Sequence, residues 1–393
     1  MRKIIVILFF LVNYKIFSQV SISPISMTEN GKLYANYGGK AIGMGGTGVA
    51  NIDKNIINFL NPATYSTIDS LLFIFNAGVF ATFVKYYSDK NSGFSSNICI
   101  NNVSFAFKIS NNIGLAFGIL PYNYVGYNLN SKIYQQGFLK QLDKNYKGEG
   151  GLYNFFAGIS FRVRKNFFGG FDICYLNGNV MREEIVSEPE FLKMYYSASK
   201  IIYYSGFFIS PGIIYNPSFN KRLFFGFKYT PSISLNGIVD YFLSMNDYDT
   251  LTYNKRKIKN KIVDKLSLGI SYKGEKINFV SDIVKYDLKQ FNKQLKFAVG
   301  SEYKIKSSRS NKDISLLSGF AYEILPDKFF DKNIYNYNFT IGLCLPVNKN
   351  SIIVSFETGK YGLQYSTSLK EYYCTMKVFL TLCEKWFERR KYY

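Results

Sequence analysis

Histidine is absent from this chain of 393 residues, and tryptophan occurs only once. Without histidine, the chain cannot form Ser–His or Cys–His catalytic pairs or metal sites with imidazole ligands. The five cysteines show no CxxC spacing, and an odd number of thiols cannot all pair within one chain. Most of them fall inside segments of alternating polarity, where they serve as small packing residues. The sequence therefore predicts no enzyme, no cofactor and no metal site.

Long hydrophobic runs are also lacking. After the N-terminus, no stretch approaches the roughly 20 unbroken apolar residues that a membrane-spanning helix needs. The chain is nevertheless 47% hydrophobic and rich in aromatic residues, with 34 Tyr and 37 Phe. These apolar residues recur at every second position, which is the period of a β-strand with one apolar face. The pattern is typical of a transmembrane β-barrel, whose strands turn one face to lipid and the other to the lumen.

The first 18 residues have the pattern of a secretory signal peptide. Arg2 and Lys3 form a basic start, and residues 4–12 form an apolar run. Cleavage after Ser18 would leave Gln19 as the first residue of the mature chain. The alternative, a membrane anchor, is disfavoured because nine or so apolar residues are too few to cross a bilayer. We therefore expect an exported protein.

Acidic residues are in the minority, since 27 Asp and Glu stand against 48 Lys and Arg, a net charge of +21. A basic balance can indicate nucleic-acid binding, but an exported chain rarely meets nucleic acid, and we expect no such partner. The codon bias of an AT-rich genome would give the same spread of lysine among Asn, Ile and Tyr. A functional alternative is contact with lipopolysaccharide phosphates. The candidate residues for that contact, which could equally form a solvated basic loop, are Lys255, Arg256, Lys257, Lys259 and Lys261.

The clearest alternation lies between positions 335 and 345. One face is apolar throughout, and the other is polar or tiny, as expected for a wall between lipid and lumen. The first face comprises Tyr335, Tyr337, Phe339, Ile341, Leu343 and Leu345, and the second comprises Asn336, Asn338, Thr340, Gly342 and Cys344.

Fourteen segments with this alternation predict an all-β, antiparallel barrel of about 14 strands. Short connections alternate with long ones, notably 126–149, 179–199 and 239–260, as periplasmic turns alternate with extracellular loops. A soluble β-sandwich is the alternative, but it would have fewer strands with long aromatic faces. The predicted strands are 71–86, 97–109, 113–125, 150–163, 166–178, 200–215, 222–238, 261–273, 276–287, 293–305, 315–325, 335–347, 351–361 and 372–385.

A segment rich in Gly, Ser and Asn precedes the first strand, so we divide the chain into a signal peptide (1–18), an N-terminal segment (19–70) and a barrel (71–393). Four glycines, Gly43, Gly45, Gly46 and Gly48, allow tight turns and close backbone packing. A phosphate-binding loop is excluded because the run lacks the Lys-Ser/Thr ending. The sequence Asn61-Pro62-Ala63 follows, and Pro62 holds Asn61 in an extended conformation.

The glycine run at 43–50 followed by Asn61, Pro62 and Ala63 resembles the N-terminal hatch of the FadL/TodX family of outer-membrane transporters for long-chain fatty acids and other hydrophobic compounds. Residues 120–127, 148–152 and 385–392 are similar to a FadL-like branch of unassigned substrate. The resemblance covers most of the mature chain. It implies a fourteen-stranded barrel whose lumen is closed by a hatch, with ligand leaving sideways into the membrane. Asn61, Pro62 and Ala63 carry over as hatch residues, and no ligand-contacting position does.

Two functions follow from the sequence and the resemblance. The first is passive uptake of a hydrophobic, fatty-acid-like molecule across the outer membrane, with lateral exit near Gly118 and Pro121, where proline removes an N–H from a strand. The alternative to this exit is that Pro121 lies just above the hydrocarbon, where water donates a hydrogen bond to the neighbouring carbonyl. The second function is that of a non-transporting subunit or scaffold of a larger outer-membrane assembly or secretion machine. The expected partners are outer-membrane lipid, lipopolysaccharide, a hydrophobic small molecule and, in the second case, other outer-membrane proteins.

Overall fold

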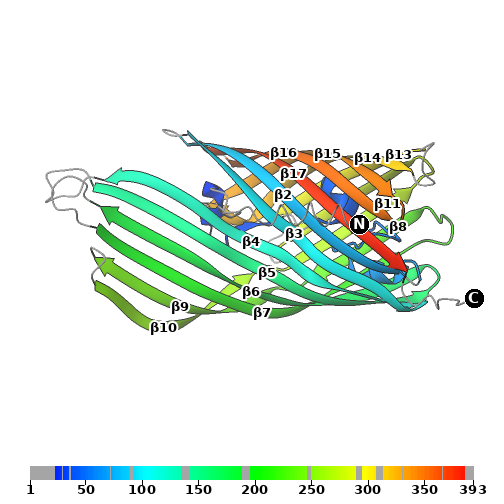
Figure 1. The fold of residues 1–393 in the computed structure, drawn as a ribbon, viewed down its shortest axis with the longest axis horizontal. Coiled ribbons are helices and arrows are strands. Elements are labelled where there is room, and N and C mark those ends of the chain that lie inside the picture. The colour runs from blue at the N-terminus through cyan, green and yellow to red at the C-terminus, as the bar shows by residue number, and fades with distance from the viewer. Residues whose placement is uncertain are drawn as a thin grey trace, which may run out of the picture.

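The computed structural model shows a closed antiparallel β-barrel with short elements inside it (Figure 1). It describes residues 23–28, 30–34, 37–70, 72–88, 92–133, 142–187, 195–245, 249–288, 294–306, 313–329, 331–364 and 366–385. The expected signal peptide, residues 1–18, lies outside these ranges. No helix in the described ranges has the length and apolarity needed to cross a membrane.

The elements are the 3-10 helices η1 (Pro24–Met27), η2 (Gly39–Gly43) and η3 (Pro62–Thr67), a short strand β1 (Lys32–Leu33), and the wall strands. The wall comprises β2 (Leu72–Ser88), β3 (Ser92–Ser110), β4 (Ile113–Ile133), β5 (Leu142–Arg164), β6 (Phe167–Ser187), β7 (Tyr195–Tyr215), β8 (Leu223–Thr230), β9 (Ile233–Met245), β10 (Asp249–Ile262), β11 (Lys265–Lys273), β12 (Ile277–Tyr286), β13 (Leu295–Ile305), β14 (Ile314–Phe329), β15 (Lys332–Val347), β16 (Asn350–Leu363) and β17 (Ser366–Lys385).

The wall contains 14 strands, as the alternation predicts, because two of them are interrupted. β8 and β9 form one wall strand with a break at Pro231, and both pair with β7. β10 and β11 form the next, and they pair with β9 and β8 respectively. Pairing of β17 with β2 closes the barrel. Pro231 accounts for the first break, since proline cannot donate to a ladder.

The wall is much taller on one side than on the other (Figure 1). β4, β5, β6, β7, β9 and β10 extend past the rest, and we call these extensions the projecting sheet. The sequence prediction is wrong here, because large parts of the expected loops 126–149, 179–199 and 239–260 are strand. Their polar residues look like loop in the sequence, but they need no lipid-facing apolar side when the strand rises above the bilayer.

The outward face of the lower wall is apolar and the inward face is polar. On β15, Phe339 and Ile341 are more than half exposed, whereas Asn338 and Thr340 are buried inside. Exposed aromatic and aliphatic side chains occur in the same way on strands around the barrel. Such a continuous belt of exposed apolar side chains is stable only in contact with lipid. The fold is therefore that of an outer-membrane barrel.

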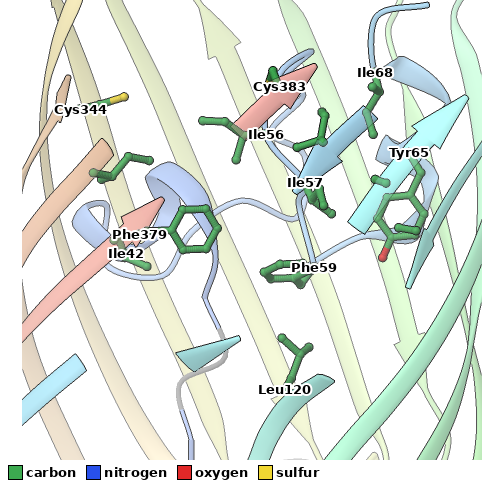
Figure 2. Close-up of a cluster of buried hydrophobic side chains, with 14 of the residues drawn as sticks. Ile42, Ile56, Ile57, Phe59, Tyr65, Ile68, Leu120, Cys344, Phe379 and Cys383 are labelled. Carbon is green, nitrogen blue, oxygen red and sulfur yellow. The ribbon is translucent and has the colours of Figure 1, made fainter. Parts of the chain in front are cut away.

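Residues 37–68 pack against the inner face of the wall. Their apolar side chains form a core with residues from several strands, as Figure 2 shows for Ile42, Ile57 and Phe59 beside Leu120 and Phe379. Since a segment of this composition cannot form a core alone, the surrounding wall supplies most of its apolar contacts.

Candidate functional site

Asn61 holds the N-terminal segment to the wall with its side chain. It is fully buried, and its amide nitrogen donates to the carbonyls of Val49 (2.8 Å), Ile213 (3.1 Å) and Phe227 (3.2 Å). Its side-chain oxygen caps η3 by accepting from the Ala63 N–H at 3.1 Å. One amide thus joins two parts of the segment to two neighbouring wall strands. Leucine or alanine at this position would leave buried backbone groups without partners.

The glycine run forms a turn held by side chains from the wall. Gly45 and Gly46 have positive φ values of 65° and 72°, which a residue with a side chain rarely adopts. The Gly45 N–H donates to Thr340 Oγ1 at 2.7 Å, and the Gly48 N–H donates to Asp282 Oδ2 at 2.6 Å. Gly43 has a different role, because its backbone lies against the wall at Gly342.

Nine wall strands carry a glycine where the N-terminal segment touches them, and we call these residues the glycine belt. A Cβ added to Gly212 would lie 2.2 Å from Asn61 Oδ1, and one added to Gly170 would lie 2.9 Å from the Pro62 backbone. The belt was not predicted from the sequence, although most wall strands carry a glycine on the inward face. The belt consists of Gly114, Gly158, Gly170, Gly212, Gly226, Gly269, Gly300, Gly319 and Gly342.

Lys40 adds a buried ion-pair network to this attachment. Its Nζ lies 3.0 Å from Asp53 and 2.9 Å from Glu302 of β13. Burial alone would lower the pKa of Lys40, but the two carboxylates raise it above its ordinary value. Burial alone would raise the pKa of Asp53, but Lys40 holds it below its ordinary value. The Lys40–Asp53 pair therefore persists at neutral pH and is lost as pH falls through the depressed pKa of Asp53.

The wall has a seam between β3 and β4. Pairing between these strands ends at Val103 and Ile119, and above this point residues 92–102 of β3 pair only with β2. Gly118 is the next residue below the end of pairing, and Pro121 lies just beyond it, beside a bulge in the β4–β5 register. The structure thus places both residues at the lower end of the seam, and the two strands diverge there (Figure 1).

The start of the N-terminal segment lies along the β4 side of the seam. β1 pairs with β4 through Lys32–Tyr124 and Leu33–Asn123. The Tyr34 N–H donates to the Tyr122 carbonyl at 3.0 Å. Farther along, the Ser23 N–H donates to the Gly126 carbonyl at 2.8 Å. β1 therefore gives hydrogen-bond partners to an edge of β4 that β3 leaves unpaired.

Three side chains, those of Ser23, Lys32 and Tyr34, connect this stretch to the β3 side of the seam. The Tyr34 ring lies 4.8 Å from the ring of Tyr124, and its hydroxyl donates to Cys99 of β3 at 3.5 Å. Lys32 forms a buried ion pair with Glu371 of β17, which also accepts from Ser23 Oγ at 2.6 Å. We call the Lys32–Glu371 pair the latch, since it fixes β1 across the seam.

A cavity of about 220 Å³ lies inside the barrel and borders the seam. Leu33, Tyr34, Leu120 and Tyr122 line it on that side, and Phe59 and Tyr65 of the N-terminal segment also line it. It carries charge as well: Lys228, Lys265, Lys296, Asp172, Asp282, Glu323 and Glu357 contribute to its wall. The interior therefore combines aromatic surface with ionic groups.

The basic cluster of the sequence analysis lies in β10, within the projecting sheet. Arg256, Lys257, Lys259 and Lys261 are exposed. Lys255 belongs to the same strand. Arg256, Lys257, Lys259 and Lys261, whose side chains the structure describes, are not among the residues that line the cavity.

A family model described as BamG matches residues 1–393. The chain belongs to the BamG family. No curated protein matches it. Among solved structures, this BamG-family chain is similar to a Pseudomonas aeruginosa FadL homologue, with a TM-score of 0.60 at 12% identity over 89% of this chain and 98% of the other.

Two further structures share the fold of this BamG-family protein. A deletion mutant of the TodX monoaromatic hydrocarbon channel has a TM-score of 0.61 at 16% identity, covering 90% of this chain and 99% of the other. The Pseudomonas putida toluene transporter TodX has a TM-score of 0.55 at 12% identity, covering 90% and 98%. At these identities the likeness concerns the fold, which is the FadL-like barrel that the sequence motif implies.

Proposed function

We propose that this BamG-family barrel takes up a hydrophobic small molecule and releases it sideways through the β3–β4 seam. The observation that carries the proposal is the contact between cavity and seam, since Leu33, Tyr34, Leu120 and Tyr122 belong to both. Outward side chains beside the seam are apolar, among them Ile98, Ile100 and Ile119. A ligand leaving the cavity here would enter lipid without crossing the periplasmic end.

The N-terminal segment, residues 19–70, would act as the hatch. Its described part has two kinds of contact with the barrel. Residues 43–65 are fixed to the glycine belt and would close the route to the periplasm. Residues 23–34 are held by backbone hydrogen bonds to β4, by the latch and by the buried packing of Ile25. Of these, the two residues of β1 occupy the seam, and they could leave the wall while residues 43–65 stay in place.

The size of the cavity limits the ligand. A cavity of about 150 Å³ holds benzene in an engineered protein, and this cavity measures about 220 Å³. A single-ring compound would fit completely, and a fatty-acid-like molecule would fit in part. The hydrocarbon channels that share the fold support a compound of this class.

A reversible lock on β1 tests the proposal. Leu33→Cys and Asn123→Cys place two thiols at facing positions of β1 and β4. In a background without the five natural cysteines, oxidation should stop uptake of a radiolabelled monoaromatic hydrocarbon into proteoliposomes, and reduction should restore it. The single variant Leu33→Cys controls for oxidation damage. Equal uptake by the oxidised and reduced forms would show that the seam is not the route.

The second candidate function, a scaffold in a larger outer-membrane assembly, is favoured by the projecting sheet. This sheet rises above the barrel and leaves one side of β10 without a paired strand in the described part of the chain. Natural proteins generally cover such an edge. Native gel analysis of the protein extracted from outer membranes in mild detergent would test this function. Migration only as a single chain would argue against a stable assembly.

A further inference from the structure

We propose that the edge of β10 that no described strand covers binds an acidic, extended segment of a partner protein, which adds as a strand to the projecting sheet. β10 pairs with β9 from Asp249 to Ile262. In the barrel order, the strand on its other side would be β12, but β12 ends at Tyr286, which pairs with Lys265 at the start of β11. The edge of β10 thus continues above the top of its neighbour. This inference does not depend on whether a ligand passes through the seam.

The direction of the backbone groups can be assigned from one hydrogen bond. The Ile262 carbonyl accepts from Ser232 Oγ at 2.9 Å, and Ser232 precedes Ile233, the β9 partner of Ile262. Since successive residues of a strand point their N–H and C=O groups to opposite sides, Lys257, Lys259 and Lys261 point theirs away from β9. The Lys261 N–H already donates to Asn260 Oδ1 at 2.7 Å. Lys257 and Lys259 therefore offer backbone groups to an added strand.

Residues 256–262 of β10 lack most of the features that usually prevent an edge strand from pairing with another chain. Short length, proline and bulges normally prevent pairing with another chain. Residues 256–262 contain no proline, and the one register shift of this pair lies above them, between Tyr253 and Arg256. What remains is charge, because Arg256, Lys257, Lys259 and Lys261 are exposed. The described structure gives none of these four an acidic partner.

This charge selects the kind of strand that can bind. A second copy of β10 would place cations opposite cations, which destabilises a strand pair. A strand with Glu or Asp at alternate positions would instead place a carboxylate beside each of Lys257, Lys259 and Lys261, which share one face of β10. The lysines then exclude self-association and admit an acidic segment. Lipopolysaccharide phosphates could also contact these cations, but they would leave the backbone edge unpaired.

Two substitutions at one position separate backbone pairing from charge. Lys259→Gln removes the charge and keeps the N–H. Lys259→Pro removes both, but it leaves the bonds to β9 because proline is tolerated where a strand N–H faces solvent. The probe is a fluorescent ten-residue peptide of alternating Glu and Val, with a Lys/Val peptide as control, titrated into the full-length protein in detergent free of lipopolysaccharide.

We expect the acidic peptide to bind and the Lys/Val peptide not to bind. Lys259→Gln should weaken binding about threefold, because it loses one charge pair. Lys259→Pro should weaken it more than tenfold, because it loses the charge pair and a backbone hydrogen bond to the added strand. Lys257→Pro should behave like Lys259→Pro, and unchanged heat-modified migration on gels would confirm that both variants fold. Equal affinities of the Pro and Gln variants would overturn strand addition. Strand addition would also be overturned if the peptide did not bind and these cations retained lipopolysaccharide through their charge.

Discussion

The two parts of the N-terminal segment are held in different ways. Residues 43–65 touch glycines of nine wall strands and make buried hydrogen bonds through Asn61 and Tyr65. Residues 23–34 lie along β4 and reach the opposite side through the latch, through Tyr34 and through Ile25, which packs in a buried cluster with residues of β14, β15, β16 and β17. The first arrangement depends on close backbone contact with nine strands, whereas the second depends on side-chain contacts that single substitutions can weaken. The difference indicates which part would open and which would stay closed.

Enlarging a belt glycine should have the largest effect. In Gly212→Leu the Cβ alone would lie 2.2 Å from Asn61 Oδ1, so residues 43–65 could not remain in place. We expect a barrel that inserts but conducts ions freely in planar bilayers. Gly169→Leu is the matched control, because a Cβ there meets nothing within 4 Å. A Gly212→Leu channel as tightly closed as the natural protein would show that the belt does not seat a plug.

Removing the Asn61 amide should have the next largest effect. Asn61→Leu leaves the carbonyls of Val49, Ile213 and Phe227 without this donor. Loss of such buried hydrogen bonds costs about 3 kcal/mol in all. We expect a lower unfolding temperature and intermittent ion conductance, because the segment would leave the belt transiently. Asn111→Leu, at an exposed position in a turn, is the control and should change neither the unfolding temperature nor the ion conductance.

Breaking the latch should loosen β1 and spare the belt. Glu371→Gln removes the negative charge facing buried Lys32, and an unpaired buried cation is strongly unfavourable. We expect a thiol at Leu33→Cys, in a background without the natural cysteines, to be labelled about tenfold faster by a maleimide, with little change in ion conductance. Asp69→Asn breaks the exposed Lys54–Asp69 pair and should leave labelling unchanged. Free ion flow through Glu371→Gln would mean that the two parts open together.

Replacing Pro121 should have the smallest effect. Pro121→Val returns an N–H to β4, but β3 has already separated from β4 at Ile119, so at most one ladder bond is gained. We expect a rise in stability of about 1 kcal/mol and slower hydrocarbon uptake. Val125→Ile, on the same strand, serves as a packing control. A more stable variant with unchanged uptake would separate Pro121 from the route and favour the scaffold function.

The local alternation of residues was enough to predict the barrel. Period-two segments such as 335–347 fix which face meets lipid, and their number predicts 14 wall strands. The motif at Asn61, Pro62 and Ala63 also pointed to a buried attachment. These features are local because each follows from the conformation of a few neighbouring residues. The outer limits of the strands were not predictable, since above the membrane a polar strand and a polar loop have the same composition.

Only the tertiary structure decided which residues meet. The belt brings together Gly114, Gly212 and Gly342, which are far apart in the chain, because the register of each strand pair sets their common height. The latch joins Lys32 to Glu371 for the same reason. The seam is likewise a relation between strands: β3 and β4 each show ordinary alternation, and nothing in either one states where their pairing ends. The sequence determined what each strand would face, and closure of the barrel determined what each strand would lie beside.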